Sequence, residues 1–240
     1  MNKTITDTFE DIANRVLYED NHLIIINKRP SEIVQGDKTG DAPMSEIIKE
    51  YLKIKFNKPG NVFIGVVHRV DRPVSGCVIF AKTDKALSRM NKLIHDRQIQ
   101  KKYWAVVKNK PPKDTDHLVH FLLKNEKQNK SYSVKPDVKG ASKAELEYKI
   151  IGRSDNFYLL EIELFTGRHH QIRAQLAEIG CPIKGDLKYG FPRSNPDAGI
   201  CLHARSVEFI HPVKKEKIFI VAPLPDEQTW NYFSEVRQAL

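Results

Sequence analysis

The sequence predicts an α+β fold in which helices flank a mixed, largely antiparallel sheet. Short apolar segments typical of strands recur along the chain, and several follow one another across short turns. Amphipathic segments with helical spacing are interspersed among them. Neighbouring strands without strict strand–helix alternation are typical of α+β proteins. No repeat or linker interrupts the 240 residues, so we expect a single compact domain over residues 1–240, with its core at 16–224.

The first half of the chain carries the clearer elements. Residues 43–56 have apolar side chains at helical spacing, and Pro43 suits the first turn of a helix. Thr83 is placed to cap a second helix over 84–96. Strands are expected at 16–18, 22–27, 62–67, 77–81 and 103–107.

The chain changes character at residues 108–143, which are rich in lysine, contain Pro111-Pro112 and show little periodicity. This region is expected to be either a mobile hairpin or a solvated loop region. Beyond it, a helix is predicted over 168–179, with Gly180 directly after its end. Strands are expected at 144–151, 158–164, 206–210 and 218–222, and a last helix at 226–239.

The net charge of the chain favours a negatively charged partner. The chain has 39 Lys and Arg against 30 Asp and Glu, which gives a net charge of +9. Such an excess favours a polyanion, because each phosphate neutralised by a basic side chain releases counterions. Charge alone leaves two explanations open, a nucleic-acid partner or a merely soluble basic surface. The composition, 40% hydrophobic and 29% charged, excludes a disordered chain.

Cysteine usage and hydropathy indicate an intracellular protein. The cysteines, Cys77, Cys181 and Cys201, are far apart and odd in number, which favours buried, reduced thiols. The polar segment 1–14 lacks the apolar core of a signal peptide, and no apolar run approaches the roughly 20 residues that span a bilayer. We therefore expect a cytoplasmic protein with no membrane partner, and a monomer by default.

A first candidate site lies in residues 67–76, where Asp71 stands between Arg69 and Arg72. Nearby positive charge favours the ionised form of a carboxylate, and such a carboxylate can act as a nucleophile or a general base. An aspartate that caps a tight turn, with arginines facing solvent, explains the same residues and is more common.

A second candidate site is the segment 166–173, at the start of the predicted helix. Gly167 would allow close approach of a ligand, and a helix N-terminus offers N–H groups to an anion, with Arg168 and Arg173 nearby. A basic helix start with solvated side chains is the simpler explanation. His169 and His170 are adjacent, so their side chains diverge by about 100°. No third ligand has suitable spacing, so we expect no metal.

A third candidate is Lys101-Lys102-Tyr103-Trp104. An aromatic ring beside two lysines suits stacking on a nucleobase with phosphate contact, and Tyr103 can also handle a proton. The alternative is that the two rings alternate across the faces of a strand, with one of them in the core. Trp104 is the better core candidate.

Together these segments resemble the RluA family of RNA pseudouridine synthases. Residues 68–76, with Asp71 inside HRVDRPVSG, are similar to the family's HRLDR-x-TSG active-site motif. Lys102-Tyr103 resembles the family's strand with a tyrosine, and residues 167–173 (GRHHQIR) resemble its GRTHQIR motif. Similar segments occur at 16–28, 180–190, 202–204 and 211–212, in the family's order, so the resemblance covers residues 16 to about 224.

The resemblance implies an isomerase that converts a uridine of ribosomal or transfer RNA to pseudouridine without a cofactor or metal. Asp71 would be the catalytic carboxylate, acting either on the sugar or by addition to the base. Tyr103 would stack on the uracil and assist proton transfer, and Arg173 would pair with Asp71. The expected RNA contacts are Arg69, Arg72, Lys28, Arg168 and Lys102, with support of the loop as a second role for Lys28 and Arg168.

The chain departs from the family pattern at four positions. Val70, Val74, His169 and Gln175 replace a leucine, a threonine, a small hydroxyl residue and a histidine. None of these changes removes a residue that the chemistry needs. Because the resemblance begins near residue 16, we expect a catalytic domain without the S4-like module that many relatives carry upstream. Residues 108–143 are our candidate for recognition of the target.

Two other functions fit part of the pattern. A non-catalytic RNA-binding protein explains the charge and the aromatic residues, but it does not explain an aspartate between arginines that face a polyanion. A serine hydrolase using Ser75, His68 and Asp71 would have its triad within eight residues, and no G-x-S-x-G motif is present.

Overall fold

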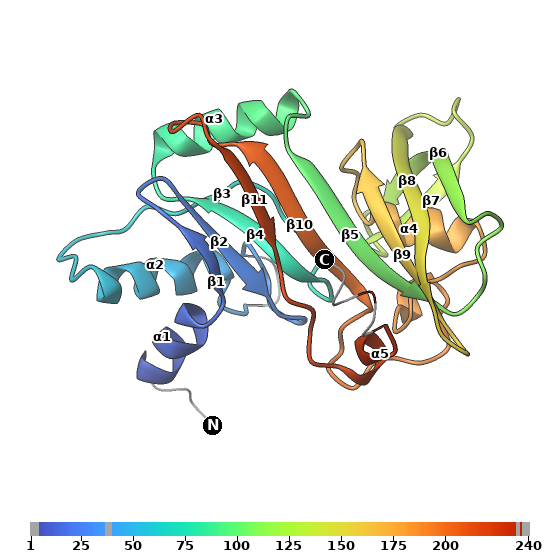
Figure 1. Cartoon of the computed structure of the whole chain (residues 1–240). Helices are drawn as coiled ribbons and strands as arrows, with labels where there is room; N and C mark the ends of the chain where they lie inside the picture. The colour runs from blue at the N-terminus through green and yellow to red at the C-terminus, as the bar shows by residue number, and fades with distance from the viewer. Residues whose placement is uncertain (1–4, 37–39, 234–235, 237–240) are drawn as a thin grey trace. The chain divides into compact units, whose positions relative to one another are not determined.

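The chain is organised in two compact units. The structure is a computed structural model that describes residues 5–36, 40–233 and 236. Unit 1 comprises Met1–Gln100 and Ala204–Pro223, and unit 2 comprises Lys101–His203 and Leu224–Leu240 (Figure 1). The first two crossings between the units fall inside strands, where composition does not change, so the sequence shows no boundary there. That the units form a single domain stays a prediction.

Unit 1 contains a predominantly antiparallel sheet with the strand order β1-β2-β4-β10, in which β11 also pairs with β10 and β3 with β4 (Figure 1). All seven residues of β4 are buried, which suits an apolar strand inside a sheet. The pairings β1–β2, β2–β4 and β10–β11 are antiparallel. The strands are β1 Val16–Glu19, β2 Leu23–Lys28, β3 Gly65–Val66, β4 Ser75–Ala81, β10 Leu202–Ile210 and β11 Lys217–Val221.

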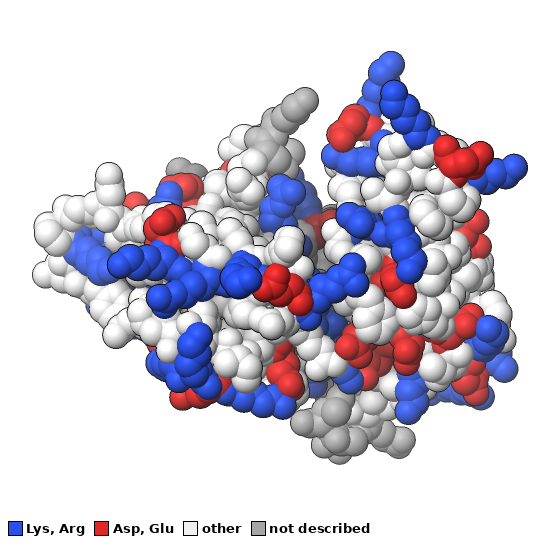
Figure 2. Space-filling model, turned by 90° about the horizontal axis from the view of Figure 1, so that it is seen from above, with Lys and Arg blue, Asp and Glu red and all other residues white. Residues whose placement is uncertain are grey.

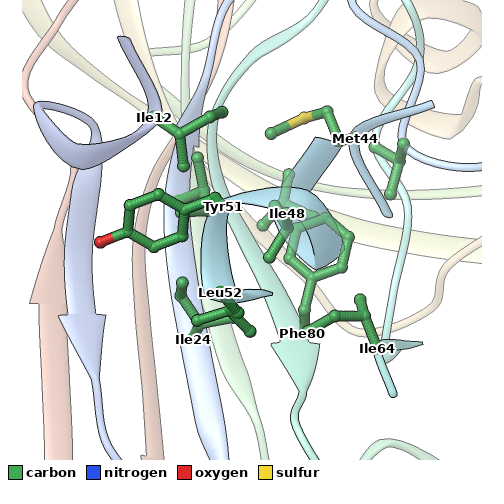
Figure 3. Close-up of a cluster of buried hydrophobic side chains, with 11 residues drawn as sticks. Ile12, Ile24, Met44, Ile48, Tyr51, Leu52, Ile64 and Phe80 are labelled. Carbon is green, nitrogen blue, oxygen red and sulfur yellow. The ribbon is translucent and has the colours of Figure 1, made fainter. Parts of the chain in front are cut away.

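The core of unit 1 lies between the sheet and helix α2, Met44–Lys55. The buried face of α2 carries Met44, Ile48 and Leu52, which recur every four residues and therefore share one side of the helix. These side chains belong to one cluster with Ile24 of β2 and Phe80 of β4 (Figure 3). Complete burial of each such side chain stabilises the fold by about 1.5–3 kcal/mol.

Two further helices belong to unit 1. Helix α3, Asp84–His95, begins as predicted, because the Thr83 hydroxyl accepts a hydrogen bond from the Ala86 N–H at 3.2 Å. Helix α1, Ile5–Ala13, was not predicted, since its sequence is mostly polar. Its Ile12 nevertheless belongs to the core cluster and is 1% exposed.

Unit 2 contains an antiparallel sheet with the strand order β5-β9-β8-β6-β7 (Figure 1). Both units therefore confirm the predicted largely antiparallel α+β fold. The elements are β5 Gln100–Val107, β6 Thr115–Asn125, β7 Lys130–Val134, β8 Ser142–Arg153, β9 Tyr158–Leu164, α4 Gln171–Glu178, the 3-10 helix η1 Leu187–Tyr189 and α5 Gln228–Asn231.

About half of the lysine-rich region is regular sheet. Strands β6 and β7 form a hairpin in which Phe121 pairs with Val134 and Asn125 with Lys130. These strands form the hairpin of the first alternative and not a solvated loop, while the expected mobility of the hairpin stays a prediction. Leu118 and Leu122 of β6 are buried, which gives the hairpin an apolar side that its lysines obscure in the sequence.

Two predicted elements differ in extent. The strand expected at 62–67 is reduced to Gly65–Val66. The helix expected at 226–239 includes α5, Gln228–Asn231, but residues 234–235 and 237–239 lie outside the described part of the chain. The three cysteines are free and buried, as predicted, and burial raises the pKa of Cys77 to about 12. Among the described residues, no helix has both the length and the apolar character needed to cross a bilayer.

Candidate functional site

The Asp71 loop, residues 67–74, connects β3 to β4 in unit 1. Asp71 is partly buried, and its carbonyl accepts a hydrogen bond from the Val74 N–H at 3.0 Å, which closes a tight turn. Gly76 follows with φ +107°, and a Cβ there would lie 2.3 Å from the carbonyl oxygen of Ala204. The Ser-Gly pair of the motif therefore lets β4 approach β10 closely where the loop ends.

Lys28 holds the Asp71 loop from the end of β2. Its side chain is 1% exposed, and its ammonium donates hydrogen bonds to the carbonyls of Arg29, Arg72 and Val74 at 2.9, 2.9 and 2.6 Å. Burial lowers the pKa of Lys28 to about 7, although the nearby carboxylates of Glu32 and Asp71 act to raise it. This burial argues for support of the loop, the second of its two expected roles, and against a phosphate contact.

The two arginines beside Asp71 are exposed. Arg72 forms an ion pair with Asp41 at 2.5 Å, whereas Arg69 lies on the surface of the loop. Both guanidinium groups are accessible to a polyanion, which agrees with the expected RNA contacts. Because Asp41 competes for Arg72, Arg69 is the better candidate of the two.

His68 and Ser75 lack the arrangement of a serine hydrolase. The Nε2 atom of His68 accepts the backbone N–H of Ile79 at 3.3 Å, so it is already engaged as an acceptor. Ser75 is 2% exposed inside β4. A catalytic histidine needs a ring nitrogen free to take the proton of the serine, and a nucleophilic serine needs access to substrate. The geometry therefore disfavours this function.

Strand β5 of unit 2 carries the predicted aromatic pair. Trp104 is fully buried, as predicted for a core residue, and Tyr103 is 7% exposed. Lys102 forms an ion pair with Glu161 of β9 at 2.7 Å and is partly exposed. Tyr103 and Trp104 point to opposite faces of β5, because side chains alternate along a strand.

The predicted helix start at Arg168 is wrong by three residues, because α4 begins at Gln171. The Gln171 side chain accepts the N–H of Arg168 at 2.9 Å and closes a turn ahead of the helix. His170 then adopts a left-handed conformation with φ +52°. Gly180 follows the helix end with φ +76°, as expected for that position.

Arg173 forms a buried ion pair with Asp186. The Nε and Nη2 atoms of Arg173 donate to the two carboxylate oxygens at 2.7 and 2.8 Å, with the side chains 5% and 1% exposed. The sequence did not predict this partner, although Asp186 belongs to the family-like segment 180–190. The expected pairing of Arg173 with Asp71 concerns residues of different units and stays a prediction.

His169 and His170 connect the turn before α4 to the β6–β7 hairpin. The Ser131 hydroxyl donates to the carbonyl of His169 at 2.7 Å and lies 2.9 Å from its Nδ1 atom. The Nδ1 atom of His170 lies 3.0 Å from the Tyr189 hydroxyl, which in turn accepts the Ser131 N–H at 2.9 Å. Burial, followed by the charge of Arg173, lowers the pKa of His170 to about 2. These histidines therefore have structural partners.

Arg168 and Gln175 also have roles inside unit 2. The Nε atom of Arg168 donates to the carbonyl of Lys143 at 2.9 Å, while the side chain stays exposed. The buried amide of Gln175 donates to the carbonyls of Leu118 and Ala144 at 3.2 and 3.3 Å, so it joins α4 to the sheet. Within the described part of the chain, no three His, Cys, Asp or Glu side chains converge as metal ligands would.

The family of RNA pseudouridylate synthases has a model that matches residues 22–178 of the chain. The ribosomal large subunit pseudouridine synthase C of Buchnera aphidicola from Acyrthosiphon pisum is 35% identical over 94% of this chain and 72% of its own length. The protein of the same name from Haemophilus ducreyi is 34% identical over 89% of this chain and 67% of its own length.

One solved structure is similar over almost the whole chain. Human RNA pseudouridylate synthase domain containing 4 has a TM-score of 0.79 and 21% identity, and the match covers 96% of this chain and 95% of that one. At this identity the likeness concerns the fold alone. It agrees with the α+β fold described above.

Proposed function

We propose that Asp71 is the catalytic carboxylate of this chain, which belongs to the RNA pseudouridine synthase family. The proposed substrate is a uridine of large-subunit ribosomal RNA, which the enzyme isomerises to pseudouridine. The chain is an isomerase that acts on RNA, as its relatives indicate. The observation that carries the role of Asp71 is the buried Lys28 ammonium, which donates to two carbonyls inside the Asp71 loop, those of Arg72 and Val74, and to the carbonyl of Arg29 after β2. Such preorganisation is what a reacting group requires.

The reaction is an internal rearrangement and therefore needs no external reactant. The C1′–N1 glycosidic bond of uridine breaks and a bond between C1′ and C5 forms. C5 loses a proton and N1 gains one, so atoms and electrons balance. Asp71 either attacks the sugar, removes a proton from it, or adds to the base. Enzymes that act on a base inside folded RNA extrude it from the stack at a cost of a few kcal/mol.

The other expected site residues have distinct proposed roles. Tyr103 stacks on the extruded uracil and assists transfer of the C5 proton. Arg173, held by Asp186, keeps the Asp71 carboxylate charged and oriented. Arg69 and Arg72 are exposed and bind the backbone of the target nucleotide.

The names of the relatives support one class of RNA as the proposed substrate. The two bacterial relatives described above are named for the large ribosomal subunit, and they are 35% and 34% identical to this chain over the aligned residues. Large-subunit ribosomal RNA is therefore favoured over transfer RNA as the substrate. We expect the enzyme to act as a cytoplasmic monomer, which gel filtration and cell fractionation test.

The hairpin of β6 and β7 is our candidate for recognition of the target. Lys130 lies 5.0 Å from the ring centroids of both Tyr132 and Tyr189. The hairpin also contacts Tyr189, whose hydroxyl accepts the Ser131 N–H at 2.9 Å and whose ring centroid lies 5.1 Å from the Arg173 guanidinium. Replacing the tip, residues 126–129, by a short glycine turn should change which uridines are modified and leave both sheets intact.

The central experiment compares Asp71→Asn with a matched control, Asp155→Asn, which alters an exposed aspartate of unit 2. Both proteins are incubated with deproteinised large-subunit ribosomal RNA, and chromatography of the nucleosides measures newly formed pseudouridine. We expect no product with Asp71→Asn and wild-type yield with the control. Equal product from Asp71→Asn and wild type would contradict the assignment of Asp71.

A further inference from the structure

An exposed aromatic ring stands among lysines at the end of α2. The ring of Phe56 is 48% exposed, although a phenylalanine is usually buried. The ammonium groups of Lys55, Lys58 and Lys82 lie 5.6, 5.7 and 4.9 Å from its centroid, within the range of cation–π attraction. The result is an apolar platform with a positive rim.

Helix α3 extends this positive charge. Its outer face carries Lys85, Arg89 and Lys92, spaced four and three residues apart and therefore aligned on one side of the helix. Helix α3 lies at the top of Figure 1, and Figure 2 shows the molecule from above. In that view basic side chains form a row across this part of unit 1. We call the set the α2–α3 basic surface: Phe56, Lys58, Lys82, Lys85, Arg89 and Lys92.

Acidic neighbours offset only part of this charge. Glu19, which is 10% exposed, pairs with Lys82 and Lys55 at 2.8 Å and so anchors the lysines under the ring. Asp96 pairs with Lys92 at 2.8 Å. Within the described ranges 5–36, 40–233 and 236, no carboxylate forms an ion pair with Lys58, Lys85 or Arg89. These three cations can therefore bind phosphates without first losing a partner.

The α2–α3 basic surface is separate from the Asp71 loop. Lys82 directly follows β4, and the Asp71 loop directly precedes it. At about 3.3 Å per residue, the seven steps from Ser75 to Lys82 span roughly 23 Å. A nucleotide on Phe56 is therefore not the nucleotide that reacts at Asp71.

We propose that the α2–α3 basic surface is a second RNA-binding site, which holds a single-stranded segment of the substrate that flanks the target uridine. An exposed ring stacks on an unpaired base of any kind, and the cations around it bind the adjoining phosphates. The proposal rests on the action of this family on RNA and adds where RNA is held outside the reacting site. Because stacking and phosphate contacts tolerate any sequence, this site contributes affinity and little choice between uridines.

The test measures binding of fluorescent oligouridylates to the full chain by anisotropy. One probe of roughly 5 nucleotides is near the minimum for a single site, and one of roughly 30 can occupy two. The variants are Phe56→Ala, its conservative partner Phe56→Trp, and the double variant Lys58→Gln with Arg89→Gln. Lys217→Gln is the matched control, since Lys217 is an exposed lysine of unit 1 that pairs with Glu208.

We expect Phe56→Ala to lower the affinity for the long probe about tenfold, because stacking contributes that order of affinity per base. Phe56→Trp should retain the wild-type affinity. The double variant should lower the slope of log K against log salt by roughly 1.4, since each phosphate contact of a single strand contributes about 0.7. The short probe should lose less affinity than the long one, because the reacting site can still bind it, and the control should be unaffected.

Two outcomes would overturn the second site. One is an affinity and salt slope for the long probe that are equal in wild type, the variants and the control. The other is an equal loss for both probes, which would show that the two probes bind at one site and that the long probe does not occupy a second. These binding values do not depend on catalysis, so they are distinct from a failure of the Asp71 assignment, which the product yield of Asp71→Asn reports.

Discussion

Arg173 and Asp186 are joined by two parallel hydrogen bonds of 2.7 and 2.8 Å, with both side chains almost fully buried. A bidentate pair of this kind fixes the plane of the guanidinium as well as its position. Arg173 is therefore oriented by unit 2 itself, through a residue 13 positions further along the chain. The guanidinium that we propose as the partner of Asp71 is therefore fixed in position before any RNA binds.

Asp186→Ala should destabilise the protein by about 3–5 kcal/mol, because it leaves the buried guanidinium of Arg173 without its carboxylate. The free energy of unfolding in urea measures this loss. Asp155→Ala, at an exposed aspartate, should change it by less than about 0.5 kcal/mol. Equal stability of the two variants would show that Asp186 does not hold Arg173.

Lys28→Met should reduce the rate of pseudouridine formation and leave the affinity for RNA nearly unchanged. The substitution keeps much of the side-chain volume but removes the ammonium that donates hydrogen bonds to three carbonyls. The Asp71 loop is then no longer held to the end of β2. Each unsatisfied buried acceptor costs about 1–3 kcal/mol, partly offset because an ammonium is no longer buried. Steady-state kinetics separate kcat from KM. Lys49→Met, at a surface lysine paired with Glu46, is the control.

The stability of the wild-type protein should rise with pH between about 7 and 10 relative to Lys28→Met. Burial lowers the pKa of Lys28 from 10.5 to about 7, so in this window the unfolded chain binds a proton that the folded chain has released. The free energy of unfolding then increases with pH, by up to about 1.4 kcal/mol per pH unit. Urea unfolding at several pH values measures the difference, and parallel curves for both proteins would contradict the lowered pKa.

His170 should make the wild-type protein more sensitive to acid than His170→Gln. Burial lowers the pKa of His170 to about 2, so below pH 6.5 the unfolded chain gains a proton that the folded chain does not. Stability is therefore lost as the pH falls from about 6.5, at up to about 1.4 kcal/mol per unit. Unfolding at pH 7 and pH 5 measures the loss. It should be smaller in His170→Gln, which does not titrate in this range.

Gly76→Ala should cost at least about 4 kcal/mol or prevent folding, whereas Gly60→Ala should be nearly neutral. At Gly76 the backbone has φ +107°, and an added Cβ would lie 2.3 Å from the carbonyl oxygen of Ala204. At Gly60 an added Cβ would meet no atom within 4 Å. Thermal unfolding of the two variants gives the comparison. A normal melting temperature for Gly76→Ala would show that β4 and β10 are further apart than described.

Local patterns in the sequence predicted most of the fold. The helical spacing of Ile48 and Leu52 predicted α2, and Thr83 predicted the start of α3, because the first signal lies inside its helix and the second directly before it. Helix α1 was missed because Ile12 and few other residues identify its apolar side. The lysine-rich region stayed open between a hairpin and a loop because its apolar residues lie in one short run, 118–123, in which exposed Val119 interrupts the alternation of buried and exposed side chains.

The candidate site was less predictable, because its geometry depends on partners distant in the sequence. The motif identified Asp71 and its arginines, but nothing near Lys28 in the chain indicates that its side chain reaches the carbonyls of Arg72 and Val74. In the same way, the charge of Arg173 suggested a partner without identifying Asp186. The late start of α4 arises from the Gln171 side chain, whose bond to the Arg168 N–H competes with helix formation.

Unit 1 consists of two segments that are far apart in the sequence, so its sheet is completed late in synthesis. Its sheet is completed by β10 and β11, but roughly 120 residues separate the end of β4 from the start of β10. At about 5–20 residues per second, the nascent β4 waits some 6–24 seconds for the strand that lies beside it. An apolar strand edge exposed for that time is a target for chaperones and a risk for aggregation. Shortening this delay by circular permutation, with β10 and β11 placed ahead of β1, should raise the yield of folded protein in a chaperone-free translation system.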